Sequence, residues 1–245
     1  MALCLERSTQ LRQDLWQITT AETSHFAFNC YVIAAQKTAL IHTGKPSQFS
    51  ATLSLLKEIL AGKTLDYVLF SHVEADECGA LAALLQAYPQ CQVVCNKVAA
   101  ISLKEMLHQP PLILDDQQTL NLGAYQLRLI NTPHFPHNWD GHLWYETQQQ
   151  WLFSSDYCSL GGIHPAVVEE PLADEMLTFM QQGGFIAHGG SVSKVTQQLA
   201  QLPVSLIATM HGPATQGGAC NQLLRSLHNA WLDRGQAELK AITYL

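Results

Sequence analysis

A short acidic motif, FSHVEADECGAL at residues 70–81, decides which folds are open to this chain. His72, Glu74 and Asp76 occupy every second position directly after LDYVLF (65–70), whose β-branched and aromatic residues predict a strand. An Ala/Leu-rich stretch with the composition of a helix follows. Three side chains that can bind metal are therefore predicted on a strand-to-helix turn, and such turns at the carboxyl ends of strands commonly hold functional sites.

The rest of the chain is predicted to alternate between strand meanders and helices. The other predicted strands are residues 15–19, 29–35, 38–44, 91–95, 125–131, 142–147, 149–156 and 204–212. The predicted helices are residues 46–62, with Ser47 or Ser50 as N-cap and Gly62 as its end, 78–89, 173–184, 191–202 and 221–234. Each half begins with strands and continues with helices. Because a sheet with one apolar face must bury it, we expect an α/β fold of αββα order, with two mixed sheets packed face to face and helices outside.

The composition supports one large domain over residues 1–245, because 47% of the residues are hydrophobic and only 13% are charged. The formal net charge of −7 opposes nucleic acid or anionic lipid as the main partner. No stretch has the length of a signal peptide core or the roughly 18 apolar residues of a membrane span. The seven cysteines are an odd number without paired spacing. We therefore expect a cytoplasmic protein with no membrane partner and with reduced thiols.

Further candidate ligands lie at or after the ends of other predicted strands. They are His134, His137 and His142 in NTPHFPHNWDGH, Asp156 in LFSSD, and His211 in TMHG. Each is a weak signal alone, because a single histidine or aspartate at a strand end is more often a cap or an exposed group. Together they are stronger, since the fold gathers strand ends at one edge. Carboxylate and imidazole ligands without thiolate suit iron, manganese or zinc, and one aspartate can bridge two ions.

With these residues in place, the chain resembles the metallo-β-lactamase superfamily, and specifically the diiron domain of flavodiiron proteins and the stand-alone oxygen-binding diiron proteins. Hydrolases of the superfamily carry His-x-His-x-Asp-His at the first motif, whereas the diiron branch carries His-x-Glu-x-Asp, and this chain has His72-Val-Glu74-Ala-Asp76. The resemblance extends from about residue 25 to 215 through FAFNCYVI, TALIHTGK, LGAYQLRLINTPHFPHNWDGHLWY, WLFSSDY and TMHGP. It implies the metallo-β-lactamase fold.

The resemblance also implies a set of metal ligands. One iron would be held by His72, Glu74 and His137, the other by Asp76 and His211, and Asp156 would bridge them. His137 is preferred to His134 because it precedes Asp156 by 19 positions, the family's usual separation. In addition, His137-Asn-Trp-Asp140 places its aspartate where the family has His-Trp-Pro-Asp.

Several nearby residues have roles that the resemblance leaves open. The family usually has histidine at position 77, whereas this chain has Glu77. Glu77 would either ligate the second iron and favour its ferric state, or turn away and weaken that position. His25 and His134 are candidate pocket residues, with exposed loop and turn histidines as the alternatives. Tyr157 could donate a hydrogen bond at the site or simply be packed, and Asp140 could orient His137.

The implied function is a non-haem diiron protein that binds dioxygen or nitric oxide and reduces it with electrons from a separate partner. Glu74, in place of the second histidine of the hydrolases, favours iron over zinc or manganese. No phosphate-binding loop of a flavodoxin module occurs before Leu245, so we expect no FMN in this chain and a flavoprotein or rubredoxin-type reductase as donor. A homodimer is also implied. The alternatives are a non-enzymatic oxygen sensor or carrier with the same metals, and a binuclear zinc hydrolase of a thioester, phosphodiester or lactam.

Overall fold

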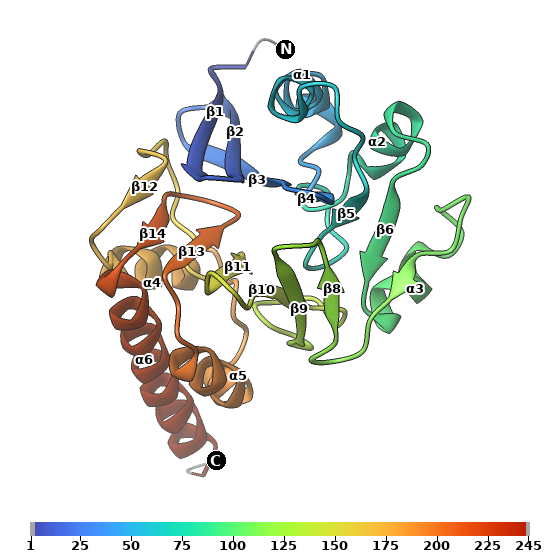
Figure 1. Cartoon of the computed structure of the whole chain (residues 1–245). Helices are drawn as coiled ribbons and strands as arrows, with labels where there is room; N and C mark the ends of the chain where they lie inside the picture. The colour runs from blue at the N-terminus through green and yellow to red at the C-terminus, as the bar shows by residue number, and fades with distance from the viewer. Residues whose placement is uncertain (1–2, 244–245) are drawn as a thin grey trace.

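The computed structural model describes residues 3–243, and its first layer is a seven-stranded sheet. The strands lie in sequence order: β1 (Leu5–Arg12), β2 (Leu15–Thr23), β3 (Phe26–Ala34), β4 (Thr38–Ile41), β5 (Tyr67–Leu69), β6 (Gln92–Cys95) and β7 (Leu112–Ile113). The first four strands form an antiparallel meander, and β4 to β7 are parallel. The carboxyl ends of β4, β5 and β6 therefore lie at one edge of this sheet (Figure 1).

The second sheet also has seven strands, in the order β12-β14-β13-β11-β10-β9-β8. Their bounds are β8 (Thr119–Asn121), β9 (Gln126–Asn131), β10 (His142–Glu146), β11 (Trp151–Ser155), β12 (Val167–Val168), β13 (Leu206–Thr209) and β14 (Ala214–Gln216). Two pairs, β11 with β13 and β12 with β14, are parallel, and the other pairs are antiparallel. Both sheets are thus mixed, as predicted.

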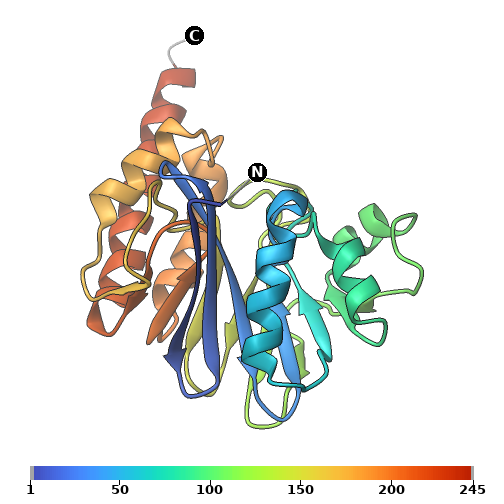
Figure 2. The same ribbon diagram turned by 90° about the horizontal axis from the view of Figure 1, so that it is seen from above.

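Helices cover the outer face of each sheet (Figure 2). The helices α1 (Phe49–Leu60), α2 (Leu81–Ala87) and α3 (Lys97–Leu103) pack on the first sheet, and α4 (Ala173–Gln182), α5 (Gly189–Gln201) and α6 (Gly218–Thr243) pack on the second. The apolar residues alternate accordingly. In β4, Ala39 and Ile41 belong to the core between the sheets, whereas Leu40 belongs to the core under α1 to α3. The predicted αββα order is therefore correct.

Some boundaries differ from the prediction. Strand β1 is not predicted because it is a half-exposed edge strand in which only Leu11 is buried. Neither Ser47 nor Ser50 caps α1: the N-cap is Gln48, which ends a short 3₁₀ turn, and Ser47 Oγ donates to Glu22 instead. The helix predicted from residue 78 begins at Leu81, because the preceding residues form the turns that hold the acidic motif.

Hydrogen bonds between the two sheets hold the edge where the strand ends meet. The Asn29 side-chain amide on β3 donates to the carbonyls of Thr209 and Gly212, at 3.1 and 2.8 Å. The Trp144 indole on β10 donates to the Phe70 carbonyl at 2.9 Å, directly before the acidic motif. Because these donors and acceptors are buried, leaving one unpaired would cost on the order of 1–3 kcal/mol. The relative placement of the two sheets at this edge is therefore well defined.

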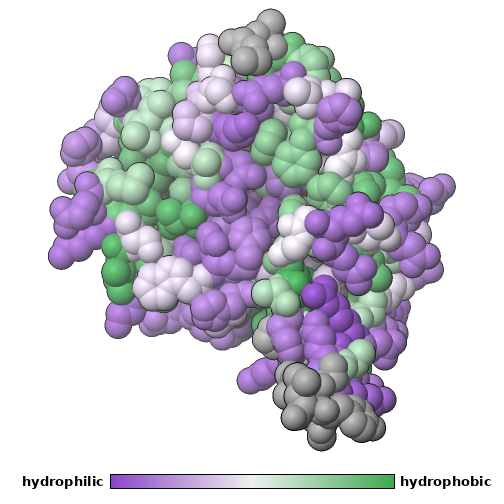
Figure 3. Space-filling view, turned by 180° about the vertical axis from the view of Figure 1, so that it is seen from behind, coloured by the Kyte–Doolittle hydropathy of each residue, from purple (hydrophilic) through white to green (hydrophobic). Residues whose placement is uncertain are grey.

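On the face shown in Figure 3, hydrophobic and hydrophilic residues are interspersed in patches. Among the described residues, the large hydrophobic side chains that are most exposed are Met106, Ile101, Leu239 and Trp139. Between residues 3 and 243, no helix combines the length and the apolar character needed to cross a membrane.

Candidate metal centre

Loops that follow four different strands bring the predicted ligands together. The acidic motif lies between β5 and α2, His137 lies between β9 and β10, Asp156 follows β11, and His211 follows β13. These segments are distant in sequence, but β9, β11 and β13 run in the same direction, because β9 and β11 are both antiparallel to β10 and β13 is parallel to β11. Their carboxyl ends therefore meet at one edge of the second sheet, and the inter-sheet hydrogen bonds described above hold that edge against the segment that carries the acidic motif.

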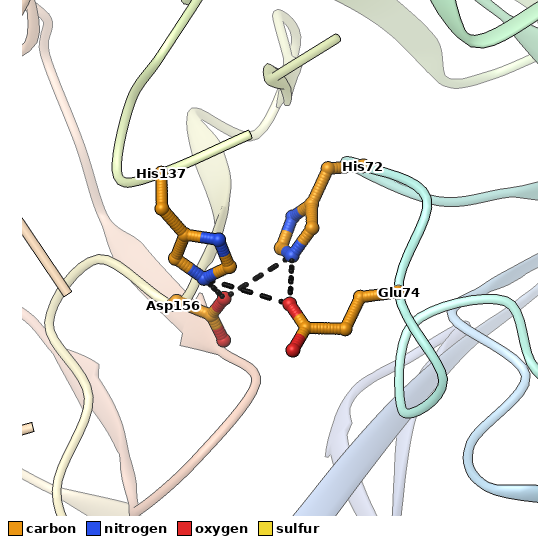
Figure 4. Close-up of side chains that lie close together, drawn as sticks. All are labelled: His72, Glu74, His137 and Asp156. Atoms are coloured by element: carbon orange, nitrogen blue, oxygen red, sulfur yellow. Dashed lines mark hydrogen bonds and ion pairs between the residues drawn. The ribbon is translucent and has the colours of Figure 1, made fainter. Parts of the chain in front are cut away.

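One donor group consists of His72, Glu74, His137 and Asp156, whose ligand atoms all lie within 4.8 Å of one another. Figure 4 shows the four side chains converging from three loops. His72 Nε2 lies 2.8 Å from Glu74 Oε2, and His137 Nε2 lies 2.8 Å from Asp156 Oδ2. Glu74 and His137 are partly exposed, with 45% and 30% of their side-chain surfaces accessible, so the group opens to solvent on their side.

A second group shares Asp156 with the first. His211 Nε2 lies 3.4 Å from Asp76 Oδ2 and 3.3 Å from Asp156 Oδ1. His211 Nδ1 lies 3.0 Å from the Ala27 carbonyl, an arrangement that directs Nε2 toward the two carboxylates. The two oxygens of Asp156 thus face different groups, because Oδ2 approaches His72 and His137 while Oδ1 approaches His211.

The electrostatics of these groups fit a pair of cations. Burial lowers the pKa of His72, but the carboxylates of Glu77, Glu74 and Asp156 outweigh it and raise the value to about 9. Burial likewise lowers the pKa of His211, but Asp156 and Asp76 raise it to about 10. Asp156 Oδ1 is buried without a hydrogen bond. Without metal, the negative charge of the carboxylates is therefore balanced by protons on the imidazoles of His72 and His211. Metal ions would replace those protons.

Of the two histidines weighed from the sequence, the structure brings His137 to the donor group and leaves His134 out of it. His134 occupies a turn with a left-handed φ of 64°, and its N–H donates to the Asn138 carbonyl. The Nδ1 of His137 lies 3.1 Å from Asn138 Oδ1. Asp140 does not orient His137, contrary to the prediction, because its Oδ2 accepts from Val73 N–H at 2.8 Å and so braces the acidic motif.

The other predicted pocket residues lie as follows. His25 is exposed, and its carbonyl accepts a hydrogen bond from Gly162 N–H. Tyr157 is wholly buried against Phe135, at a ring distance of 4.8 Å, and its hydroxyl makes no hydrogen bond. The packed alternative therefore describes Tyr157. No role at the site is evident for His25.

Glu77 lies outside both donor groups. Its side chain is wholly buried, and its Oε2 accepts a hydrogen bond from Ser71 N–H at 2.8 Å and lies 3.1 Å from His42 Nε2. Its Oε1 accepts from Ser155 Oγ. Burial raises the pKa of Glu77, but its interactions with His42 and His72 outweigh this and lower it to about 2. The Glu77 carboxylate is therefore charged. Its partners are Ser71, Ser155 and His42, and it makes no contact with Asp76 or His211 among the described interactions.

Aromatic side chains that sequence reasoning missed line both donor groups. The Phe26 ring lies 4.2 Å from that of His211 and 5.9 Å from that of Phe179 on α4. Phe179 contacts Phe185 at 5.6 Å, and Phe185 lies 6.1 Å from His137. These rings form a continuous series of aromatic contacts, an apolar wall that runs from His211 to His137. No ligand spacing marks them in the sequence, because they come from β3 and from the α4 region.

His142, the remaining candidate ligand, lies outside both donor groups. It is wholly buried, its Nδ1 lies 2.9 Å from the Asp140 carbonyl, and its Nε2 has no hydrogen-bond partner. Burial lowers the pKa of His142 to about 4 from the usual 6.5. This histidine is therefore neutral in the folded protein, and it is a core residue.

We expect His142 to make the metal-free protein sensitive to mild acid. As the pH falls below 6.5, His142 binds a proton in the unfolded chain. In the folded chain it stays neutral until about pH 4. The free energy of unfolding should fall by on the order of 3 kcal/mol across that interval. Carboxylates with lowered pKa, such as Glu77 with its usual value of 4.5, lose their contribution as the pH falls below about 4.5, at the lower end of this interval. Urea unfolding from pH 6.5 to 4.5 should therefore show a slope that His142→Gln removes, and an unchanged slope would contradict the assignment.

A family profile described as ODP family beta lactamase matches residues 26–212, more than half of the 245-residue chain. The chain belongs to this family. The matched segment contains every residue of the two donor groups, from His72 to His211. The resemblance to the metallo-β-lactamase superfamily and to flavodiiron cores is thereby confirmed.

Relatives of this ODP-family chain are longer proteins. Diflavin flavoprotein A 2 of Synechocystis sp. is 30% identical over 230 residues, which cover 89% of this chain and 38% of that protein. The anaerobic nitric oxide reductase flavorubredoxin of Aliivibrio fischeri is 26% identical over 248 residues, which cover 94% of this chain and 49% of that protein. The chain therefore spans less than half the length of these two relatives.

Solved structures share the fold of this ODP-family chain. A fragment of diflavin flavoprotein A 5 from Nostoc sp. matches with a TM-score of 0.81 and 22% identity, covering 96% of this chain and 98% of that one. Rubredoxin oxygen:oxidoreductase from Desulfovibrio gigas matches with a TM-score of 0.81 and 17% identity, covering 92% of this chain and 61% of that one. At these identities the likeness concerns the fold alone, and it confirms the predicted αββα architecture.

Proposed function

We propose that this protein holds two iron ions and uses them to bind and reduce dioxygen or nitric oxide. The observation that carries the proposal is the placement of Asp156, whose two oxygens face separate donor groups of histidine and carboxylate. A carboxylate placed in this way could bridge the two ions of a binuclear centre. The donor set has no thiolate, which suits iron, manganese or zinc.

The chain's own residues would divide the task between the two ions. His72, Glu74 and His137 would hold the first ion, Asp76 and His211 would hold the second, and Asp156 would hold both. When bound, a pair of ferrous ions supplies one electron from each iron to a small oxidant. The partly exposed Glu74 and His137 give that oxidant access, while the wall of Phe26, Phe179 and Phe185 favours a small uncharged molecule over an anionic substrate.

The relatives support the choice of substrate and of electron source. One of them is named as an anaerobic nitric oxide reductase flavorubredoxin, and one structural neighbour as a rubredoxin oxygen:oxidoreductase. These names motivate dioxygen and nitric oxide as substrates. Two ferrous ions are exhausted by a single two-electron reduction, so turnover requires a donor. We propose a flavoprotein or a rubredoxin-type reductase in that role.

The test is anaerobic loading of the metal-free protein with ferrous iron, followed by metal counting and exposure to dioxygen or nitric oxide. We expect about two irons per chain and a new visible absorption band that appears with one of the gases. Repeated gas consumption with a chemical reductant would identify a reductase, and a single lasting optical change would identify a sensor. Tight zinc binding with hydrolysis of a thioester, phosphodiester or lactam, and no response to either gas, would overturn the proposal.

A further inference from the structure

The Glu77 carboxylate is the centre of a buried hydrogen-bond cluster that the proposed function does not use. It accepts hydrogen bonds from Ser71 N–H and Ser155 Oγ, and its Oε2 lies 3.1 Å from His42 Nε2. The side chains of Glu77 and His42 are both wholly buried. Burying a carboxylate is costly unless it is paired and hydrogen-bonded. Three donors around one carboxylate meet that requirement and leave it fixed in orientation.

Two residues around Glu77 have strained backbones. His42 has φ of 67° and Ser155 has φ of 53°, values in the left-handed region that residues other than glycine rarely adopt. Such strain persists only where the surrounding structure demands it, and it is concentrated at functional sites. The conformation of Ser155 places its hydroxyl on Glu77 and its neighbour Asp156 between the two donor groups.

The same cluster also approaches the Nδ1 side of the His72 imidazole. His72 Nδ1 lies 3.4 Å from Ser155 Oγ and 3.7 Å from Glu77 Oε1. On the other side of the ring, His72 Nε2 faces Glu74 and Asp156 at 2.8 and 3.4 Å. Since Ser155 Oγ donates to Glu77, its lone pairs are free to accept the Nδ1 hydrogen of His72. The arrangement leaves Nε2 of His72 as the metal-binding nitrogen.

We propose that Glu77 is a positioning residue for His72, acting on its Nδ1 side directly and through Ser155, and is not a ligand of the second ion. The inference rests on the metal centre of the proposed function and adds the group that orients one of its ligands. A carboxylate behind a metal-bound histidine fixes the ring and increases its basicity, and removing such a partner typically costs about 10- to 100-fold in metal affinity. The effect is expected at the first position, where His72 lies.

The experiment measures zinc affinity by competition with a chelator, so that it does not depend on redox chemistry. It is made in chains that carry Asp76→Asn, which weakens the second position and leaves the first one to be titrated. We expect Glu77→Gln to raise the dissociation constant for zinc by about 10- to 100-fold. The matched control is Glu146→Gln, because Glu146 is also wholly buried and accepts hydrogen bonds from backbone N–H groups of residues 126, 148 and 149. The Glu146→Gln variant should lower the midpoint temperature of thermal unfolding without changing the affinity for zinc.

A second variant keeps the test decisive if Glu77→Gln does not fold. Ser155→Ala removes the relay between His72 and Glu77 and should weaken zinc binding in the same direction. In the zinc-loaded parent chain, the Nδ1–H resonance of His72 should be visible and downfield in the proton NMR spectrum, and Ser155→Ala should shift it. Unchanged zinc affinity and an unchanged resonance would overturn the proposal. So would a Glu77→Gln effect that appears only when Asp76 is intact, because Glu77 would then be a ligand of the second ion.

The two proposals fail in different ways. A chain that binds zinc as described but shows no response to dioxygen or nitric oxide after iron loading would overturn the proposed function and leave the role of Glu77 standing. A parent chain that binds neither zinc nor ferrous iron would overturn both.

Discussion

Replacing Asp156 by asparagine should empty both metal positions, the largest single effect expected for this site. The Asp156 side chain is 5% exposed, and its two oxygens lie 2.8 Å from His137 Nε2 and 3.3 Å from His211 Nε2. Asparagine keeps the shape but loses the charge and one of the two ligand oxygens. We expect the metal affinity to fall by more than about 100-fold at each position. Losing a group that is hydrogen-bonded to a metal ligand already costs about 10- to 100-fold in metal affinity, and losing the ligand itself should cost more.

The measurement is metal content after anaerobic iron loading and desalting, with and without the substitution. Glu146→Gln serves again as the control for loss of a buried carboxylate away from the site, and it should retain the metal content of the parent chain. An Asp156→Asn variant with full metal content would refute both the bridging role and the binuclear centre.

His137→Ala should remove one of the two ions and spare the other. His137 contributes only to the group that contains His72 and Glu74, and it is absent from the contacts of Asp76 and His211. The first position should lose more than about 100-fold in affinity, so metal content should fall from about two ions per chain to about one. The half-exposed position of His137 makes a folding defect a minor concern.

His134→Asn is the control that tests the choice between the two histidines. Asparagine tolerates the left-handed φ of 64° at this position better than alanine does, so the turn should persist. The two ions should remain in this variant. If His134→Asn lost an ion and His137→Ala kept both, the assignment of the ligand from this loop would be reversed.

The strand-to-helix placement of the acidic motif could be predicted from sequence because it depends on local patterns. The run from Leu65 to Phe70 has strand composition, and alternating His72, Glu74 and Asp76 follow it at once. The αββα order was predictable for a similar reason, since strands such as β4 alternate between two buried faces. The edge strand β1 was missed because it buries only one residue and so lacks such a pattern.

The aromatic wall was not predictable because its members share no motif. Phe26 belongs to β3, Phe179 to α4 and Phe185 to the loop after it, and only packing brings them beside the two donor groups. The orientation of Asp140 was mispredicted for a related reason. A carboxylate three residues after a histidine could reach that histidine or the facing loop, and in the structure the Oδ2 of Asp140 accepts from the loop N–H of Val73 at 2.8 Å.

The sequence by itself determined which residue types stand at the strand ends, and therefore that histidine and carboxylate ligands without thiolate were available. It also determined that position 77 carries a carboxylate, where the resemblance stated from the sequence implies histidine. Only the tertiary structure decided that Asp156 lies between two donor groups and that Glu77 pairs with His42, Ser71 and Ser155. The physical reason is that a strand end sets where a side chain starts, whereas the packing of the two sheets sets which partners it can reach, and a buried carboxylate must take the donors within its reach.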